Sequence, residues 1–164
     1  MSSILPWPNV EMNSLMVLIS VISYDIWFYI SHIILHYEFM YAHHKLHHSK
    51  LVPSARDTYL ASSVETIFQG VGILYPSFYL QITNQTSLSY IIKVESYDYL
   101  LLALFIVNIR GMMAHDPRFV FLIGNHHLLH HKYNNCNYGQ FYLDYMLGTC
   151  HPKKEEYRYG LIYT

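Results

Sequence analysis

The chain has 164 residues, 52% of them hydrophobic, and a formal net charge of −1 at pH 7. This length is typical of one domain, and we expect residues 1–164 to form it. The ten Lys and Arg residues form no run or stripe that could follow a phosphate backbone, so we do not expect nucleic acid as a partner. The mean hydropathy of +0.14 is high for a soluble protein of this size, which favours a membrane protein.

The N-terminal residues and the cysteines exclude two other classes. Residues 1–11 carry two prolines and no basic region, so they do not resemble a cleavable signal peptide, and any membrane segment should remain in the mature protein. Cys136 and Cys150 are the two cysteines, too few for a disulfide framework and too far apart for a Cys-x-x-Cys site. We expect both thiols to be reduced.

The first apolar segment covers residues 15–35, where Asp25 and His32 are the ionisable residues. A membrane-spanning helix needs about 20 apolar residues, so this segment is long enough to cross a bilayer. Ionisable side chains on such a helix should face the protein interior rather than lipid.

Two further apolar segments follow. Residues 59–82 are less apolar and contain Gly70, Gly72 and Pro76, which predicts a bent or partly re-entrant membrane helix. Residues 90–109 form the second half of the resulting hairpin. We therefore predict an all-α integral membrane protein with about three apolar helices.

The positive charges predict how these helices are oriented. If both middle segments cross the membrane, residues 36–57 and 110–164 lie on one side and residues 83–89 on the other. Nine of the ten Lys and Arg residues, all except Lys93, then lie on the first side, as the positive-inside rule requires of a cytoplasmic face. A glycosylation sequon at Asn84 falls in the opposite loop. We expect a cytoplasmic cap of short helices.

Histidine is the most unusual feature of the composition, with twelve residues in the chain. Three clusters lie on the predicted cytoplasmic side: residues 32–36 have the pattern H-x-x-x-H, and residues 44–48 and 127–131 both have H-x-x-H-H. Residues three or four apart share one face of a helix, so each cluster can present several imidazoles together. The first pattern alone is weak evidence, but two copies of the second are strong evidence for a metal site.

The number of histidines indicates two metal ions. The first cluster supplies two imidazoles and each of the others three, more than the four ligands of a structural zinc ion or the six of an octahedral ion. Zinc peptidases carry a Glu beside the first histidine, where this chain has Lys45 and Leu128. The clusters also lack the Glu-x-x-His pairs of soluble di-iron bundles. The pattern favours oxygen-dependent redox chemistry on a membrane lipid.

These clusters, with residues 25–32 and 137–149, resemble the fatty acid hydroxylase and sterol desaturase superfamily over about residues 25–149. Residues 107–109, His115-Asp116 and residues 126–140 are most similar to the carbon-5 sterol desaturase branch. Two departures are visible: Ile33 stands where many relatives have Arg, and the chain begins about thirty residues before its first cluster, where relatives have a further membrane hairpin.

The resemblance implies the fold, the cofactors and the partners of the family. It implies a pair of iron ions, replaceable by zinc in purified protein, with O2 as co-substrate and a sterol or fatty acyl lipid as substrate for hydroxylation or desaturation. Electrons would come from NAD(P)H through cytochrome b5 and its reductase, since the chain has no Gly-rich dinucleotide motif. The protein would lie in the endoplasmic reticulum or an equivalent membrane, with its histidines facing the cytoplasm. The implied metal ligands are His32, His36, His44, His47, His48, His115, His127, His130 and His131.

Two other functions remain open on the sequence. The chain can be a shortened, non-catalytic relative that binds metal, or a zinc-dependent hydrolase, which the missing Glu disfavours.

Several residues near the clusters have weaker predictions. His43 and His126 flank the ligand positions and are expected beside the ligands or at the surface, and His151 is expected to have no special role. Asp25, Asp116 and Asp144 can each either orient a ligand or serve in a cap or buried polar network. Residues 134–139 are predicted to form a turn that returns the chain past the third cluster.

Overall fold

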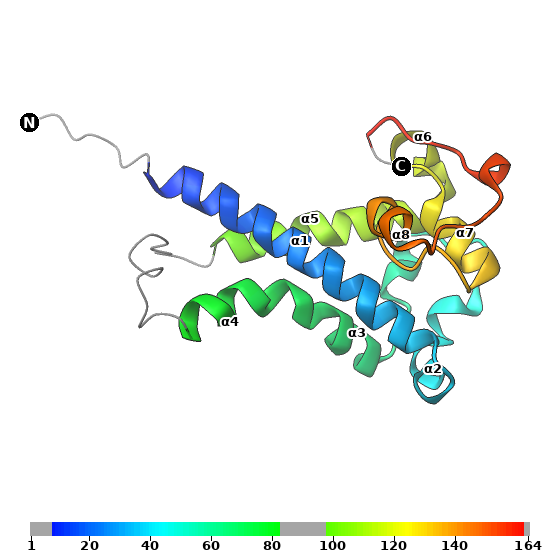
Figure 1. The fold of residues 1–164 in the computed structure, drawn as a ribbon, viewed down its shortest axis with the longest axis horizontal. Helices are drawn as coiled ribbons and strands as arrows, with labels where there is room; N and C mark the ends of the chain where they lie inside the picture. The colour runs from blue at the N-terminus through cyan, green and yellow to red at the C-terminus, as the bar shows by residue number, and fades with distance from the viewer. Residues whose placement is uncertain (1–7, 83–97, 163–164) are drawn as a thin grey trace, which may run out of the picture.

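The computed structural model describes residues 8–82 and 98–162, and in these ranges it contains helices and no strand. The all-α fold is thereby confirmed. Four helical segments form an elongated body, and shorter helices gather at one end of it (Figure 1). The long body contains α1 (Pro8–His36), α3 (Ser63–Gly70), α4 (Tyr75–Ile82) and α5 (Asp98–His115), and the end contains α2 (Glu38–His44), α6 (Val120–Ile123), α7 (His126–Tyr133) and α8 (Phe141–Leu147).

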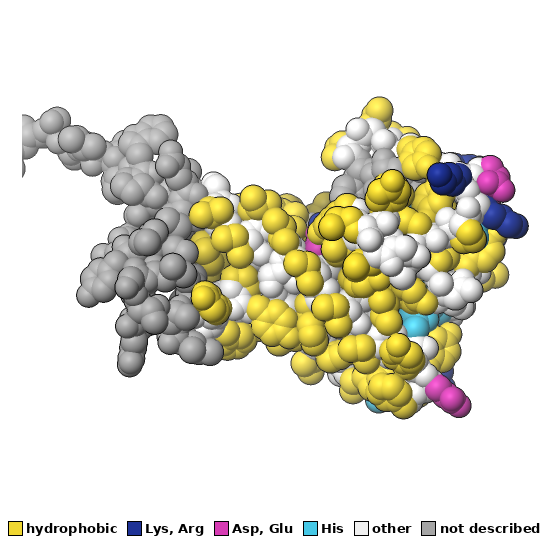
Figure 2. Space-filling view, viewed as in Figure 1, with side chains coloured by type: hydrophobic (Ala, Val, Ile, Leu, Met, Phe, Trp, Pro, Cys, Tyr) yellow, Lys and Arg dark blue, Asp and Glu magenta, His cyan; other side chains and the backbone are white. Residues whose placement is uncertain are grey.

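Helices α1 and α5 are the two candidate membrane spans in the described residues, over Ser14–His36 and Asp98–His115. Their outer faces carry large exposed apolar side chains, which favours contact with lipid rather than water. Figure 2 shows apolar side chains along the body, while Lys and Arg lie at the end that holds the histidines. The exposed set includes Leu18, Ile22, Ile26 and Ile30 on α1, and Leu101, Leu102, Phe105 and Ile109 on α5.

The apolar segment predicted at residues 59–82 is not a single long helix. It consists of α3, a 3-10 helix η3 (Val71–Leu74) and α4, each too short to cross a membrane alone, and the structure gives it no candidate span. The run lies along α1 and is bent, as the glycines and the proline predicted (Figure 1). A third membrane-spanning helix therefore has no support in the described residues. The loop with the sequon at Asn84, and Lys93, lie outside them.

The other two predicted segments agree better with the structure. The first lies within α1, which begins earlier at Pro8, and it matches the candidate span Ser14–His36 closely. Helix α5 starts at Asp98 and continues past residue 109 to His115. Residues 90–97 lie outside the described part of the chain. The extension matters because it places His115 at the end of α5, among the short helices.

The core of the body lies where α1, η3 and α5 meet. Gly72 permits the closest approach, because a Cβ atom on it would lie 2.5 Å from Cβ of Trp27. Polar bonds reinforce this contact: Ser23 Oγ donates to the Gly72 carbonyl at 2.8 Å and Trp27 Nε1 donates to the Phe68 carbonyl at 2.6 Å. Small residues and interhelical hydrogen bonds hold helices together where lipid removes the hydrophobic driving force. The buried apolar residues of the core are Met16, Val17, Ile73, Tyr99, Ala103 and Val107.

A buried ion pair joins the body to the cap. The Arg110 guanidinium on α5 donates two hydrogen bonds to the Asp25 carboxylate on α1, and Tyr142 on α8 donates to the same carboxylate at 3.2 Å. Breaking such a pair leaves an uncompensated buried charge, so it fixes how α1, α5 and α8 meet.

The glycines of the bent run give a matched test of this packing. We expect Gly72→Ala to destabilise the detergent-solubilised protein by about 1–3 kcal/mol, because the added methyl meets Trp27. Gly70→Ala is the control, since nothing lies within 4 Å of its Cβ position and alanine is the better helix former. Thermal unfolding followed by circular dichroism measures both. Equal midpoints for the two variants would show that the α1–η3 contact is not tight.

Candidate metal centre

Nine histidines from five parts of the chain converge at the capped end of the body, in two groups. Within each group the nitrogen atoms that face inward lie within 4.8 Å of one another. The first, the five-histidine group, contains His32, His36, His44, His48 and His130; the second, the four-histidine group, contains His47, His115, His127 and His131. The structure thus brings together all nine histidines predicted as metal ligands.

The division between the groups follows helical geometry. Histidines four residues apart share a group: His44 with His48, and His127 with His131. The middle histidine of each H-x-x-H-H cluster belongs to the other group. In α7 this follows from helical geometry, since adjacent residues point about 100° apart. In the first cluster the chain passes from the end of α2 at His44 into a 3-10 helix, η1 (His47–Ser49). His47 therefore joins the four-histidine group, and His130 joins the five-histidine group.

In the five-histidine group the Nε2 atoms face one another at close range. His44 Nε2 lies 3.0 Å from Nε2 of both His32 and His48. His130 Nε2 lies 3.0 Å from Nε2 of His48 and 3.1 Å from that of His36. Five nitrogen atoms therefore surround one small volume.

The four-histidine group shows the same geometry. His115 Nε2 lies 3.1 Å from Nε2 of His47 and also 3.1 Å from that of His127. Both ring nitrogens of His131 are buried without a hydrogen-bonding side chain. Four nitrogen atoms therefore converge in this group as well.

Backbone carbonyls determine which ring nitrogens carry the protons. Nδ1 of His32 is hydrogen-bonded to the Tyr138 carbonyl, Nδ1 of His130 to the Cys136 carbonyl at 2.7 Å, and Nδ1 of His115 to the Gly111 carbonyl at 2.7 Å. A carbonyl oxygen only accepts, so each Nδ1 must carry the proton, and each neutral ring then has a bare lone pair on Nε2. Nε2 of each of these three rings therefore points its lone pair into its own group.

The turn after α7 supplies two of these carbonyls. Asn134 and Asn137 adopt positive φ values of 62° and 58°, and the chain reverses there, as predicted for residues 134–139. The buried Asp144 carboxylate holds the turn by accepting the backbone N–H of Tyr138 at 2.8 Å and of Gly139 at 2.7 Å. Asp144 thus acts on the site through the backbone that positions His32.

Among the described contacts, none of the three predicted aspartates touches a histidine of either group. Asp25 pairs with Arg110, and Asp116 caps the next turn by accepting the backbone N–H of Arg118 at 3.0 Å. Asp144 accepts a hydrogen bond from His126 Nε2 at 3.0 Å. Each aspartate therefore serves in a helix cap or a buried polar network and does not accept a hydrogen bond from a predicted metal ligand.

The remaining histidines lie outside both groups. His43 is partly exposed and His126 is buried against Asp144. His151, for which no special role was expected, is buried and stacks on the Tyr133 ring with a centroid distance of 4.2 Å.

Burial and crowding keep these imidazoles neutral. Desolvation, followed by repulsion from neighbouring histidines, lowers the pKa of His44 to about 2, of His48 to about 3 and of His131 to about 2. The pKa values of His47, His127 and His130 are also well below the usual value, for the same reasons. Neutral imidazole is the form that binds metal.

Sequence reasoning missed Glu65 as a residue of this site. Its side chain is 1% exposed, its Oε1 lies 2.8 Å from Nδ1 of His44, and the same oxygen lies 3.9 Å from Nδ1 of His47. The available signal was a carboxylate within an apolar segment, since such residues face functional interiors.

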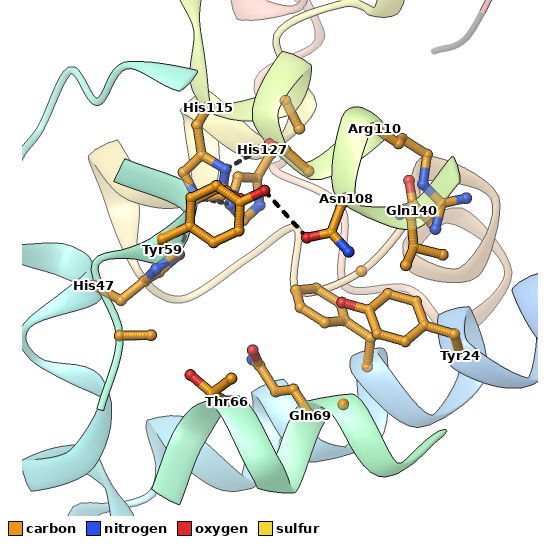
Figure 3. A pocket seen from close by; sticks show the side chains of 18 of the residues that line it. Tyr24, His47, Tyr59, Thr66, Gln69, Asn108, Arg110, His115, His127 and Gln140 are labelled. Carbon is orange, nitrogen blue, oxygen red and sulfur yellow. Dashed lines mark hydrogen bonds between the residues drawn. The ribbon is translucent and has the colours of Figure 1, made fainter. Parts of the chain in front are cut away.

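A cavity of about 460 Å³ adjoins the four-histidine group (Figure 3). His47, His115 and His127 line it, whereas no member of the five-histidine group does. It extends between α3 and α5, past Thr66 and Gln69. Beside it, the Tyr59 hydroxyl donates to Asn108 Oδ1 at 3.3 Å. Among its apolar lining residues are Phe28, Ala61, Ile73, Leu104, Val107 and Ala114.

Comparison with known proteins identifies the class. A profile of the fatty acid hydroxylase family matches residues 17–149, which is most of the chain and includes all three histidine clusters. The chain belongs to this family, within the fatty acid hydroxylase and sterol desaturase superfamily, and its members are membrane-associated oxidoreductases acting on lipids. The carbon-5 sterol desaturase branch is not distinguished by this match. Searches of curated proteins and of solved structures gave no match.

The lowered histidine pKa values predict acid sensitivity. The unfolded chain takes up protons at its histidines near pH 6.5, whereas the folded, metal-free chain does not until far lower pH. Protons therefore favour the unfolded state, so stability is greatest above about pH 6.5 and falls as the pH decreases. After chelation, the thermal midpoint should drop steadily between pH 7.5 and pH 5. A midpoint that is constant across this interval would contradict the burial of neutral imidazoles.

Proposed function

We propose that this protein is an oxygen-dependent di-iron lipid oxidase, a hydroxylase or a desaturase, that acts on a sterol or fatty acyl lipid. The observation that carries the proposal is the close approach of histidine Nε2 atoms to one another within each group. His32 places Nδ1 against the Tyr138 carbonyl and His44 places Nδ1 against the Glu65 carboxyl group, and their Nε2 atoms are 3.0 Å apart. Such contacts repel unless a cation lies among them, and each group is shaped to hold one.

The number of nitrogens supports iron over a structural zinc ion. The five-histidine group offers one nitrogen more than the four that tetrahedral zinc takes. Imidazole ligands also suit iron, and the family consists of lipid oxidoreductases.

The cavity supports a lipid substrate. Its volume of about 460 Å³ is within the range of roughly 300–1,000 Å³ usual for ligand sites, and it lies between helices whose outer faces are apolar. A lipid could enter it from the bilayer without crossing water. Because the four-histidine group lines the cavity, we assign the reacting carbon to that side of the centre.

The two irons would supply oxygen activation and removal of hydrogen from an unactivated carbon. The protein groups would position the ligands and the substrate and exclude water. The four-histidine group faces the substrate, the apolar cavity wall excludes water, and the Tyr138 and Cys136 carbonyls hold Nε2 of His32 and His130 inward. Electrons would come from NAD(P)H through cytochrome b5 and its reductase.

The location we propose is the endoplasmic reticulum or an equivalent membrane, with the histidine groups at the cytoplasmic surface. The two candidate spans and the lipid-compatible outer faces support membrane insertion. The Lys and Arg side chains at the histidine end support the orientation by the positive-inside rule (Figure 2).

A non-catalytic metal-binding relative is the alternative that the following experiments separate from an enzyme. The cavity beside the four-histidine group favours an enzyme, since a structural metal site needs no substrate space.

Removing one ligand from the four-histidine group tests the metal centre. We expect wild-type protein purified in detergent to contain about two irons per chain, and the His47→Ala and His127→Ala variants to lose iron together with lipid oxidation. Elemental analysis and lipid profiling of expressing cells measure the two effects. His43→Ala is the control, because His43 belongs to neither group. One zinc or no metal in the wild type, with an unchanged lipid profile, would overturn the proposal.

Filling the cavity tests substrate binding separately. Thr66→Trp places a large ring in the cavity and should reduce product formation by at least about tenfold without changing the iron content. Val64→Trp is the matched control on the same helix, since Val64 is 44% exposed and does not line the cavity. Full activity of Thr66→Trp would exclude this cavity as the substrate site.

A further inference from the structure

Glu65 is the one carboxylate in the described residues that contacts both histidine groups. Its Oε1 lies within hydrogen-bonding distance, 2.8 Å, of Nδ1 of His44, in the five-histidine group. The same oxygen lies 3.9 Å from Nδ1 of His47, in the four-histidine group. Both histidines direct the opposite nitrogen, Nε2, into their respective groups.

Two of the buried polar atoms without a hydrogen-bond partner in this region belong to this pair of residues. Glu65 Oε2 and His47 Nδ1 are both buried and have no hydrogen bond. Burying a carboxylate oxygen and a ring nitrogen without partners is costly, and a small rotation of the carboxylate would let each satisfy the other. The arrangement is therefore suited to one carboxylate serving two imidazoles.

The local structure at the start of α3 shows that the Glu65 side chain does not cap its own helix. The Ser62-x-x-Glu65 pattern is that of a capping box, in which the acidic side chain accepts the backbone N–H of the N-cap residue. Ser54 and Asp57 form both halves of such a box earlier in the chain, with Ser54 N donating to Asp57 Oδ2 at 2.8 Å. At α3 one half is present, Glu65 N to Ser62 Oγ at 3.1 Å, and the carboxylate is hydrogen-bonded to His44 instead.

We propose that Glu65 is a positioning residue shared by the two metal ions. By accepting Nδ1–H from His44 and from His47, it holds both rings in the tautomer that presents Nε2 to metal, one ring in each group. Loss of a hydrogen-bond partner behind a metal-bound histidine typically lowers metal affinity about 10–100-fold. A single substitution at Glu65 should therefore weaken the binding of both ions, although Glu65 is a ligand of neither. This inference rests on the metal binding proposed above.

Cobalt binding to the full-length protein in detergent tests the shared role. Metal-free protein is titrated with Co²⁺ against a competing chelator, and both the affinity and the number of ions per chain are measured. Glu65→Leu should lower the affinity for both ions by about 10–100-fold. In Glu65→Gln the amide oxygen can still accept from His44, but its NH2 group cannot accept from His47, so the four-histidine ion should be weakened more than the other. Gln69→Leu is the matched control, one helical turn further along α3 and also lining the cavity.

Imidazole nitrogen spectra of the zinc-loaded wild-type protein give a readout that a merely structural role would not move. His44 and His47 should both show a protonated Nδ1 and a metal-bound Nε2. An unprotonated Nδ1 on His47 would overturn the shared role without any variant. Two Co²⁺ ions bound by Glu65→Leu with wild-type affinity would also overturn it. Failure of the wild type itself to bind metal would instead refute the proposed function on which the inference rests.

Discussion

The structure depends on the mutual repulsion of imidazole lone pairs that the fold forces together. Backbone carbonyls fix protons on Nδ1 of His32, His115 and His130, and Nε2 atoms in each group meet at 3.0–3.1 Å. Protonation would relieve some of this contact, but burial disfavours it by lowering the histidine pKa values. A bound cation in each group relieves the repulsion without adding charged imidazoles, so metal binding and correct packing of the cap are coupled.

The membrane helices hold this crowded centre in place. Helices α1 and α5 each end at a histidine of the centre, His36 and His115, and the Asp25–Arg110 ion pair fixes their relative position below it. The bent run after α3 packs on α1 through Gly72 and brings Glu65 behind both groups. The same bend leaves room for the cavity between α3 and α5, so one irregular segment shapes both the metal surroundings and the substrate space.

The two groups differ in what surrounds them. The five-histidine group has the Tyr138 and Cys136 carbonyls behind two of its rings and does not line the cavity, whereas the four-histidine group adjoins it. An ion with fewer protein ligands has more positions free for other ligands. This asymmetry gives the two sites different roles in the proposed reaction.

The sequence by itself determined the helical class, the first apolar segment and eight of the nine histidines, because apolar length and i, i+4 spacing act locally along the chain. His115 lies in no cluster and was predicted only from the family resemblance. Only the tertiary structure decided how those histidines divide. His47 and His48 are neighbours yet belong to different groups, since adjacent helical residues point apart and their partners come from distant segments. The role of Glu65, the burial of His151 and the bent run in place of a third long helix likewise depend on packing between segments, which no local pattern specifies.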